Sequence, residues 1–184
     1  NYYRVDPRFG SNAEYKGLAE SVRAHGMKLI MDMIMNHCGS EHPWMQDLPT
    51  ADWINNAGEF APTTHRRTTL RDPYVAQTDL NAFSDGWFVK EMPDLNQRQP
   101  LLADYLIQNT IWWIEYADLD GLRVDTYSYN NKEAIAQWTK AIMDEYPNLN
   151  IVGEVWLHDQ AQMAYWQKDS PIGAIQGFNS HMSS

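Results

Sequence analysis

Gly-Leu-Arg-Val-Asp, the stretch at residues 121–125, carries two charges at a spacing that could do chemistry. If the stretch is a β-strand, Arg123 and Asp125 point to the same face, because side chains alternate between the two faces of a strand. An isolated Arg-x-Asp pair is also typical of a surface ion pair on an edge strand, which contributes little to stability. The surrounding sequence has to decide between these two interpretations.

A second carboxylate, Glu154, follows Asp125 by about the length of one βαβ unit. That interval predicts that the two residues lie on neighbouring parallel strands, which are ~4.8 Å apart when they are in register. Their carboxyl groups would then lie within several ångströms of one another. Repulsion raises the pKa of one carboxyl group in such a pair, while a guanidinium beside the other keeps it ionised.

A proton donor beside an ionised carboxylate is the arrangement that glycoside hydrolysis requires, and a separation of ~5–5.5 Å indicates the retaining route. Asp125, which shares its strand face with Arg123, is the better candidate for the nucleophile. Glu154 is the better general acid, because its neighbours Val155 and Trp156 are apolar. The alternative is a set of ion pairs that only closes the end of a sheet.

The elements that would position these residues can be predicted from periodicity. Ser11 and Glu14 form a capping-box pattern at the start of an amphipathic helix, whose apolar face includes Leu18 and which ends at Gly26. The nearly continuous apolar run at 27–35 then predicts a parallel strand buried on both faces. Further elements are a helix from Pro100 to about 116, a strand at about 119–125, a helix at about 131–146, a strand at 150–156 and a helix at about 159–168.

The segment between about 38 and 90 is irregular, with four prolines and scattered Asn, Asp, Gly and Thr. A loop of this length is uncommon in a compact domain, so we interpret it as a functional excursion with small structure of its own. Its basic cluster at 65–67 is interpreted as solvated surface.

Helices alternating with strands predict parallel strands joined by right-handed crossovers, as in doubly wound sheets and (β/α)8 barrels. No Gly-x-Gly-x-x-Gly follows a strand, which disfavours a dinucleotide-binding fold. Polar residues stand at the carboxyl ends of the three predicted strands, the face that carries the chemistry of a barrel. They are Asp32, Asn36 and His37 on the first, Arg123 and Asp125 on the second, and Glu154 on the third.

Composition limits the classes of partner. The formal charge of −10 and the pI near 4.9 argue against binding to a nucleic-acid backbone, whereas neutral ligands fit. A single cysteine, Cys38, excludes an internal disulfide. No apolar run approaches the ~20 residues of a membrane span, and the first residues lack a signal-peptide layout, so the compartment is not indicated.

Three stretches resemble signature regions of the α-amylase family of glycoside hydrolases: DMIMNH at 32–37, GLRVD at 121–125 and GEVW at 153–156. MPDLN, at 92–96, resembles the short motif of neopullulanases, cyclomaltodextrinases and maltogenic amylases. The resemblance implies an α/β fold that is a portion, about strands 3 to 5, of a (β/α)8 TIM barrel. Residues 1–37 and 91–184 would form the partial barrel, and 38–90 a B-domain excursion after strand 3.

The same resemblance implies that Asp125 is the nucleophile and Glu154 the acid/base, with Arg123 holding Asp125 ionised. His37 would bond the sugar on the non-reducing side of the cleaved bond, and Asp32 would support Arg123.

Asn36 would be a structural residue that helps to bind calcium in many relatives. No cofactor is expected to be required, and calcium is left open here because neopullulanase-like members often lack that site.

The implied function is a retaining hydrolase of α-1,4 bonds in starch, pullulan or cyclodextrins, with α-1,6 cleavage and glycosyl transfer left open. Implied partners are an α-glucan, the remainder of the barrel and, through kinship with cyclomaltodextrinases, a second copy of the parent protein. Two departures stand out: Thr126 to Tyr129 replace a basic or Asn-Glu pair on the leaving-group side, and Asn179-Ser180-His181 does not supply the family's third carboxylate.

A barrel needs about 250 residues, so we expect these residues to be a piece of a catalytic domain, inactive alone. The alternative is a non-catalytic relative that binds sugar or a protein partner.

Overall fold

The computed structural model describes residues 1–157, 160–168 and 180–183, and it shows a parallel sheet with helices between its strands. The strands, in sheet order, are β1 (Ile30–Met33), β2 (Gly121–Val124), β3 (Asn150–Glu154) and β4 (Ser180–Ser183). The helices between and before them are α1 (Asn12–Ala24), α3 (Pro100–Ala117), α4 (Lys132–Glu145) and α5 (Gln160–Lys168). The predicted order of strands and helices and their parallel arrangement are confirmed.

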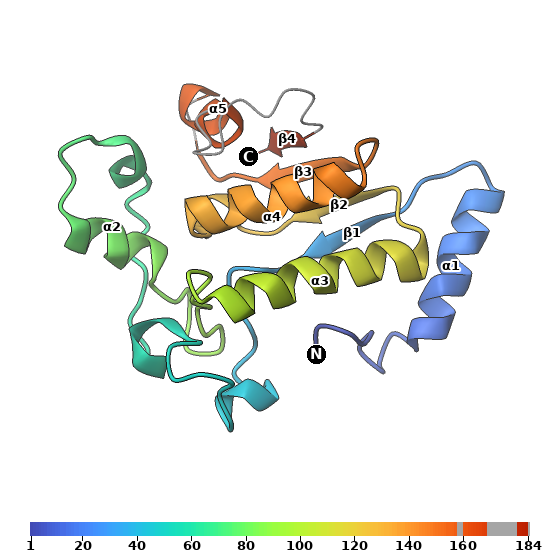
Figure 1. Cartoon of the computed structure of the whole chain (residues 1–184), viewed down its shortest axis with the longest axis horizontal. Helices are drawn as coiled ribbons and strands as arrows, with labels where there is room; N and C mark the ends of the chain where they lie inside the picture. The colour runs from blue at the N-terminus through green and yellow to red at the C-terminus, as the bar shows by residue number, and fades with distance from the viewer. Residues whose placement is uncertain (158–159, 169–179, 184) are drawn as a thin grey trace.

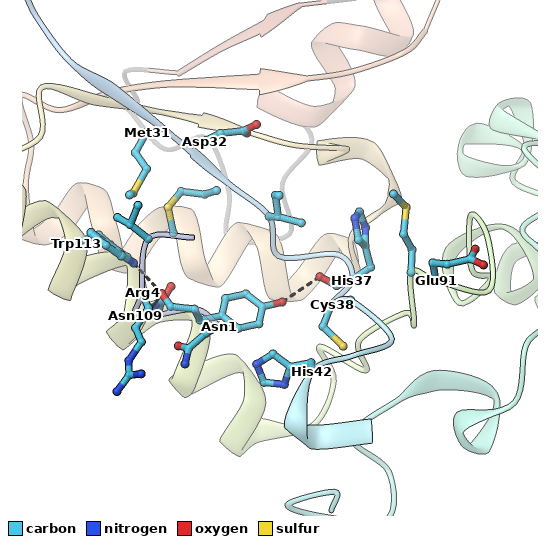
Figure 2. Close-up of a pocket in the computed structure, with 16 residues that line it drawn as sticks. Asn1, Arg4, Met31, Asp32, His37, Cys38, His42, Glu91, Asn109 and Trp113 are labelled. Carbon is cyan, nitrogen blue, oxygen red and sulfur yellow. Dashed lines mark hydrogen bonds between the residues drawn. The ribbon is translucent and has the colours of Figure 1, made fainter. Parts of the chain in front are cut away.

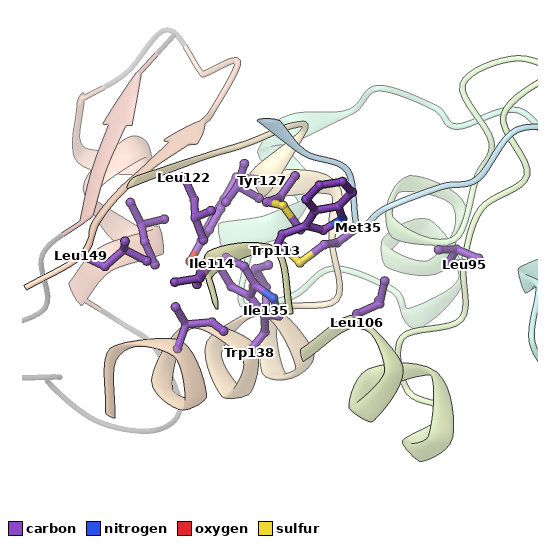
Figure 3. Packing of buried hydrophobic residues seen from close by; sticks show 14 of the residues in the cluster. Met35, Leu95, Leu106, Trp113, Ile114, Leu122, Tyr127, Ile135, Trp138 and Leu149 are labelled. Carbon is purple, nitrogen blue, oxygen red and sulfur yellow. The ribbon is translucent and has the colours of Figure 1, made fainter. Parts of the chain in front are cut away.

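Helices α3 and α4 lie side by side over one face of the sheet, and α1 packs against α3 (Figure 1). The core forms where these helices meet the strands. Leu122 and Ile151 are fully buried on the sheet. Ile114 and Trp138 approach Leu122 from α3 and α4 (Figure 3). This packing fixes the strands that carry the polar residues at their carboxyl ends.

The predicted capping box opens α1. The Ser11 hydroxyl accepts from the backbone N–H of Glu14 at 3.2 Å, and the Glu14 carboxylate accepts from the backbone N–H of Ser11 at 2.8 Å. The inward face is narrower than predicted, because Ala19 is the buried residue of α1 whereas Leu18 is 51% exposed.

Strand β1 is less buried than its apolar sequence predicts. The expectation of burial on both faces is wrong: Ile30 is 53% exposed, and Ile34, just after the strand, is 42% exposed. The physical reason is that β1 stands at an edge of the four-stranded sheet and pairs with β2 on one side.

Strand β4, by contrast, has no counterpart among the predicted elements. Its residues, Ser-His-Met-Ser, lack an apolar strand pattern, yet they pair in parallel with β3. Asp159, where the last predicted helix was expected to begin, lies outside the described residues, as does Asn179.

The segment between β1 and α3 extends beyond the carboxyl ends of the strands (Figure 1). It contains the short helices η1 (Pro43–Met45), η2 (Asn55–Gly58) and η3 (Arg67–Arg71) and the longer α2 (Gln77–Ser84). Its two ends are joined, because the backbone N–H of Cys38 donates to Pro93 at 3.0 Å and that of Ser40 donates to Glu91 at 3.0 Å. The domain limits at 38 and 90 stay a prediction. Within the described residues, none of the helices has the length and apolar character needed to cross a membrane.

Candidate active site

Arg123 is the centre of a cluster of three carboxylates. Its Nη1 lies 2.7 Å from a carboxylate oxygen of Asp32 and 2.7 Å from one of Asp125, and its Nη2 lies 2.8 Å from Oε1 of Glu154. The sequence pattern thus corresponds to a real juxtaposition: the predicted nucleophile, the predicted acid/base and the predicted support of Arg123 all contact one guanidinium.

The sheet explains why these side chains meet. Asp32 on β1 pairs with Arg123 on β2, and β3 runs parallel to β2 in register. Asp125 follows the end of β2, where its backbone N–H donates to Met33 at 3.0 Å. Glu154 ends β3. Because parallel strands end at one edge of the sheet, four charged groups from three strands converge there.

Glu154 accepts further hydrogen bonds from two residues whose part in the site was not predicted. The backbone N–H of Thr126 donates to Oε2 at 3.0 Å, and the indole N–H of Trp156 donates to Oε1 at 3.0 Å. Thr126 has a left-handed backbone, with φ of 46°, and precedes the short helix η4 (Tyr127–Tyr129). This unusual conformation directly after Asp125 turns the chain so that its N–H faces Glu154.

Burial sets the protonation of His37. It is 9% exposed, and burial lowers its pKa although the charge of Asp125 acts in the opposite direction. Its Nδ1 is buried and has no hydrogen-bond partner within the part of the chain that the structure describes. His37 is therefore a neutral imidazole at pH 7 with an unused polar atom.

Arg123 is held as a cation. Although partial burial acts in the opposite direction, hydrogen bonds to Asp32 and Asp125 raise its pKa above the ordinary value. The guanidinium is therefore a permanent positive charge between the carboxylates.

A cavity of about 280 Å³ contains the two predicted catalytic carboxylates. It is lined by His37, His65, Phe88, Met92, Asp125, Thr126, Ser128, Tyr129, Glu154 and Trp156. Two carboxylates, two histidines and several aromatic rings are suited to a neutral polar ligand with apolar faces, such as a sugar.

A larger cavity, of about 460 Å³, lies beside β1 and is lined by Asp32 and His37 but by neither Asp125 nor Glu154. Figure 2 shows His37 and Glu91 on one side of it and Trp113 on the other. Because Asp125 and Glu154 line the smaller cavity, we take that cavity as the candidate active site.

The side chain of Asn36 takes part in a hydrogen-bonded cluster. Its amide N–H donates to Asp94 at 2.9 Å, and that of Asn55 donates to the other carboxylate oxygen of Asp94 at 2.7 Å. Calcium takes roughly six to eight oxygen ligands. No group of three or more His, Cys, Asp or Glu suited to a metal occurs among residues 1–157, 160–168 and 180–183. Around Asn36 the described hydrogen bonds bring together one carboxylate, that of Asp94, and two amides, and no step below uses a calcium ion.

The basic cluster at 65–67, expected to be solvated surface, lies partly in the site. His65 is exposed but lines the smaller cavity, and its Nδ1 lies 3.0 Å from the Tyr129 hydroxyl. Arg67 is half-buried, and its Nε lies 3.4 Å from the same hydroxyl. These contacts could not be predicted from the sequence, because the segment has no helical or strand periodicity that would indicate where its side chains point.

Comparisons with known proteins identify the family of this chain. The family model described as "Alpha amylase, catalytic domain" matches residues 1–183. A cyclomaltodextrinase of Thermoanaerobacter pseudethanolicus is 30% identical over 185 residues, covering 97% of this chain and 29% of that protein. An intracellular maltogenic amylase of Bacillus subtilis is 27% identical over 158 residues, covering 85% of this chain and 25% of that protein.

Among solved structures, the alpha-amylase of Geobacillus thermoleovorans, complexed with acarbose, superposes with a TM-score of 0.73 at 30% identity. The match covers 91% of this chain and 34% of that one. The chain therefore spans less than a third of the length of the two curated relatives and about a third of this structural neighbour.

Proposed function

The chain belongs to the alpha-amylase catalytic-domain family, and from that premise we propose that its site hydrolyses glucosidic bonds of α-glucans by a retaining double displacement. The observation that carries the proposal is the contact of Asp125 and Glu154 with neighbouring nitrogens of the single guanidinium of Arg123, at the edge of one cavity. Carboxylates bound to one guanidinium lie close together, which supports the retaining route, for which the separation is about 5–5.5 Å.

In the first step Glu154, protonated, gives its proton to the glycosidic oxygen while Asp125 attacks the anomeric carbon. The bond to the leaving sugar breaks, and a glycosyl ester forms on Asp125. Arg123 holds Asp125 ionised until the attack. Glu154, now a carboxylate, removes a proton from the incoming water or sugar hydroxyl, whose oxygen displaces Asp125 and restores the original anomeric configuration.

His37 contributes to binding. Its neutral imidazole lines the cavity, so the ring is suited to a hydrogen bond with a sugar hydroxyl on the non-reducing side of the cleaved bond. Asp32 contacts Arg123 from β1 with both carboxylate oxygens, at 2.7 and 2.8 Å, and so orients it toward Asp125.

The proposed substrates are cyclodextrins, pullulan and starch-type glucans, cleaved at α-1,4 bonds. Product analysis with pullulan determines whether α-1,6 bonds are cleaved as well. The cyclomaltodextrinase and the maltogenic amylase among the relatives favour this class, as does the motif at 92–96. A dimer of the protein stays a prediction from the family resemblance, as does the expectation that no cofactor is required, with calcium at Asn36 left open.

The test uses Asp125→Asn and Glu154→Gln in the full protein with β-cyclodextrin, pullulan and soluble starch. Each variant should lose turnover by at least about 10³-fold, because each group takes part in bond making or breaking. Glu20→Gln, on the exposed surface of α1, is the matched control and should retain wild-type activity. The anomeric configuration of the first product, followed by proton NMR, should be retained.

Inversion of the product would overturn the double displacement while leaving hydrolysis intact. A wild-type protein that binds maltooligosaccharides with no products would instead support the non-catalytic alternative.

A further inference from the structure

One wall of the smaller cavity is lined by residues from three separate parts of the chain. His65 comes from the segment between β1 and α3, Tyr129 comes from η4 and Trp156 follows β3. We call these three residues the aromatic wall, and Arg67, from the same segment as His65, contacts it. His65 Nδ1 and Arg67 Nε lie 3.0 and 3.4 Å from the Tyr129 hydroxyl, and the Arg67 guanidinium lies 6.0 Å from the centre of the Trp156 ring.

The Tyr129 side chain is a rigid anchor for this wall. It is 3% exposed, and its ring stacks on Phe83 at 4.7 Å and contacts Phe88 at 4.7 Å. Its hydroxyl is therefore fixed in position, and it positions the side chains of His65 and Arg67 that hydrogen-bond to it.

The hydrogen bonds at this hydroxyl orient the ring of His65. Arg67 donates to the Tyr129 oxygen, and Nδ1 of His65 is hydrogen-bonded to the same hydroxyl as donor or acceptor according to its tautomer. With Nδ1 engaged in this contact, Nε2 is the ring nitrogen on the side away from Tyr129.

The backbone conformation of His65 indicates a functional role for this residue. Its φ is 53°, a left-handed conformation that costs a non-glycine residue energy and is concentrated at functional sites. The conformation is maintained although His65 is exposed and gains little from burial.

The aromatic wall lies on the general-acid side of the cavity. Trp156 donates its indole N–H to Glu154, and Arg67 joins Trp156 to Tyr129 and so to His65. His37 is separated from His65 by the Phe88 ring, whose centre lies 5.7 Å from one imidazole and 5.8 Å from the other. Because the general acid protonates the oxygen of the departing sugar, the wall attached to Glu154 borders the leaving group.

We propose that His65 is a specificity-determining residue that hydrogen-bonds through Nε2 to a hydroxyl of the sugar on the leaving-group side. Tyr129 and Arg67 are positioning residues that hold its ring in place. The inference rests on the proposed function, because it assigns a role within that reaction. It also gives the excursion a direct part in substrate choice, at the position where the sequence after Asp125 departs from the family pattern.

The experiment compares two substrates in the full protein. Maltotriose places a sugar on the leaving-group side, whereas p-nitrophenyl α-maltoside places an aromatic ring there that lacks the sugar hydroxyls. His65→Ala should lower the ratio of kcat/KM for maltotriose to that for the aryl substrate by about 3- to 10-fold, the effect of one lost hydrogen bond. His65→Asn should restore part of the ratio, since Asn tolerates the left-handed backbone and carries an N–H donor.

Tyr129→Phe tests the positioning role, because it keeps the buried ring and removes the hydroxyl that orients His65. It should shift the same ratio in the same direction by a smaller factor. Arg66→Ala, beside His65 and exposed, is the control and should leave the ratio unchanged.

An equal loss on both substrates in His65→Ala and Tyr129→Phe would overturn the inference and indicate a structural role. Absence of turnover in the wild-type protein with either substrate would overturn the proposed function itself, so the two failures are distinguishable.

Discussion

Arg123 is shared by three carboxylates, and a single cation cannot neutralise all of them. With Glu154 protonated as the general acid, Asp32 and Asp125 still leave the cluster with a net negative charge. The transition state of glycoside cleavage resembles an oxocarbenium ion and is positive at the sugar ring. A fixed negative field around that ring stabilises the transition state more than the neutral ground state.

Replacing Arg123 by Lys keeps the positive charge but removes the planar guanidinium that contacts three carboxylates. A lysine ammonium is a point charge on a flexible stem, and it cannot hold three carboxylates in the fixed directions of a guanidinium. We expect kcat to fall by about 10²- to 10³-fold, with a stable fold. Steady-state kinetics on β-cyclodextrin would measure the loss, with Arg23→Lys, on α1, as the matched control. Kinetics of Arg123→Lys within twofold of wild type would show that charge alone is sufficient.

Trp156 is over half exposed, at 56%, and its most specific contact is the hydrogen bond to Glu154. Trp156→Phe keeps an aromatic ring and removes the N–H donor. Because the contact is to the acid/base and not to a binding group, we expect a fall of about 3- to 10-fold in kcat with little change in KM.

The same kinetics on Trp112→Phe provide the control, since that ring packs between Tyr3 and Tyr116 and lines no part of the smaller cavity. A rise in KM with unchanged kcat in Trp156→Phe would assign the indole to sugar binding instead.

At the scale of elements, Asp94 joins three parts of the chain. Asn36 follows β1, Asn55 begins η2, and Asp94 lies in the motif at 92–96 that precedes α3. The carboxylate is 2% exposed, and its two oxygens accept from the two amides. Asp94 therefore fixes the points at which the excursion leaves the sheet and returns to it. Because His65 lies in the excursion, Asp94 also helps to fix the position of the aromatic wall.

Burial raises the pKa of Asp94 well above its ordinary value of 3.8, against the opposing effect of the Asn55 amide. A carboxyl group whose folded pKa is raised favours the folded state while it is protonated. That contribution is present below pH 3.8 and is lost as pH rises through the folded pKa. Asp94 should therefore make unfolding easier as pH increases from about 4 toward neutrality.

Asp94→Asn removes this titration, so the difference in the free energy of unfolding between wild type and variant should change steadily over that pH range. Urea unfolding followed by tryptophan fluorescence at several pH values measures it. His37, whose pKa is lowered by burial, changes stability in the opposite direction but is common to both proteins and cancels in the difference. A pH-independent difference would mean that Asp94 is ionised throughout.

At the scale of the whole molecule, the predictable features were those fixed by local periodicity. The capping box at Ser11, the apolar runs of the strands and the polar residues at strand ends place Asp125 and Glu154 on one edge, because the βαβ geometry leaves few alternatives. The contacts of His65 and Arg67 depend on how an irregular segment folds back over the sheet. Strand β4 forms by pairing with β3 and not by its own pattern.

The exposure of β1 has a consequence for these 184 residues when they are produced as an isolated polypeptide. Within the described residues β1 has a free edge, and Ile30 on it is 53% exposed. A free apolar edge is a template for pairing with another chain, and charged side chains on an edge prevent such pairing. We expect the isolated polypeptide to self-associate as its concentration rises, and Ile30→Lys to reduce that association. Light scattering coupled to size-exclusion chromatography measures both.

The matched control is Leu18→Lys, which places the same charge on an apolar side chain of similar exposure, 51%, on α1 and away from the sheet edge. Added charge alone raises solubility in either variant, so only a larger effect of Ile30→Lys assigns the association to strand pairing. Equal effects of the two variants would locate the contact elsewhere. A monomer at every concentration would show that β1 is protected from pairing despite its free edge.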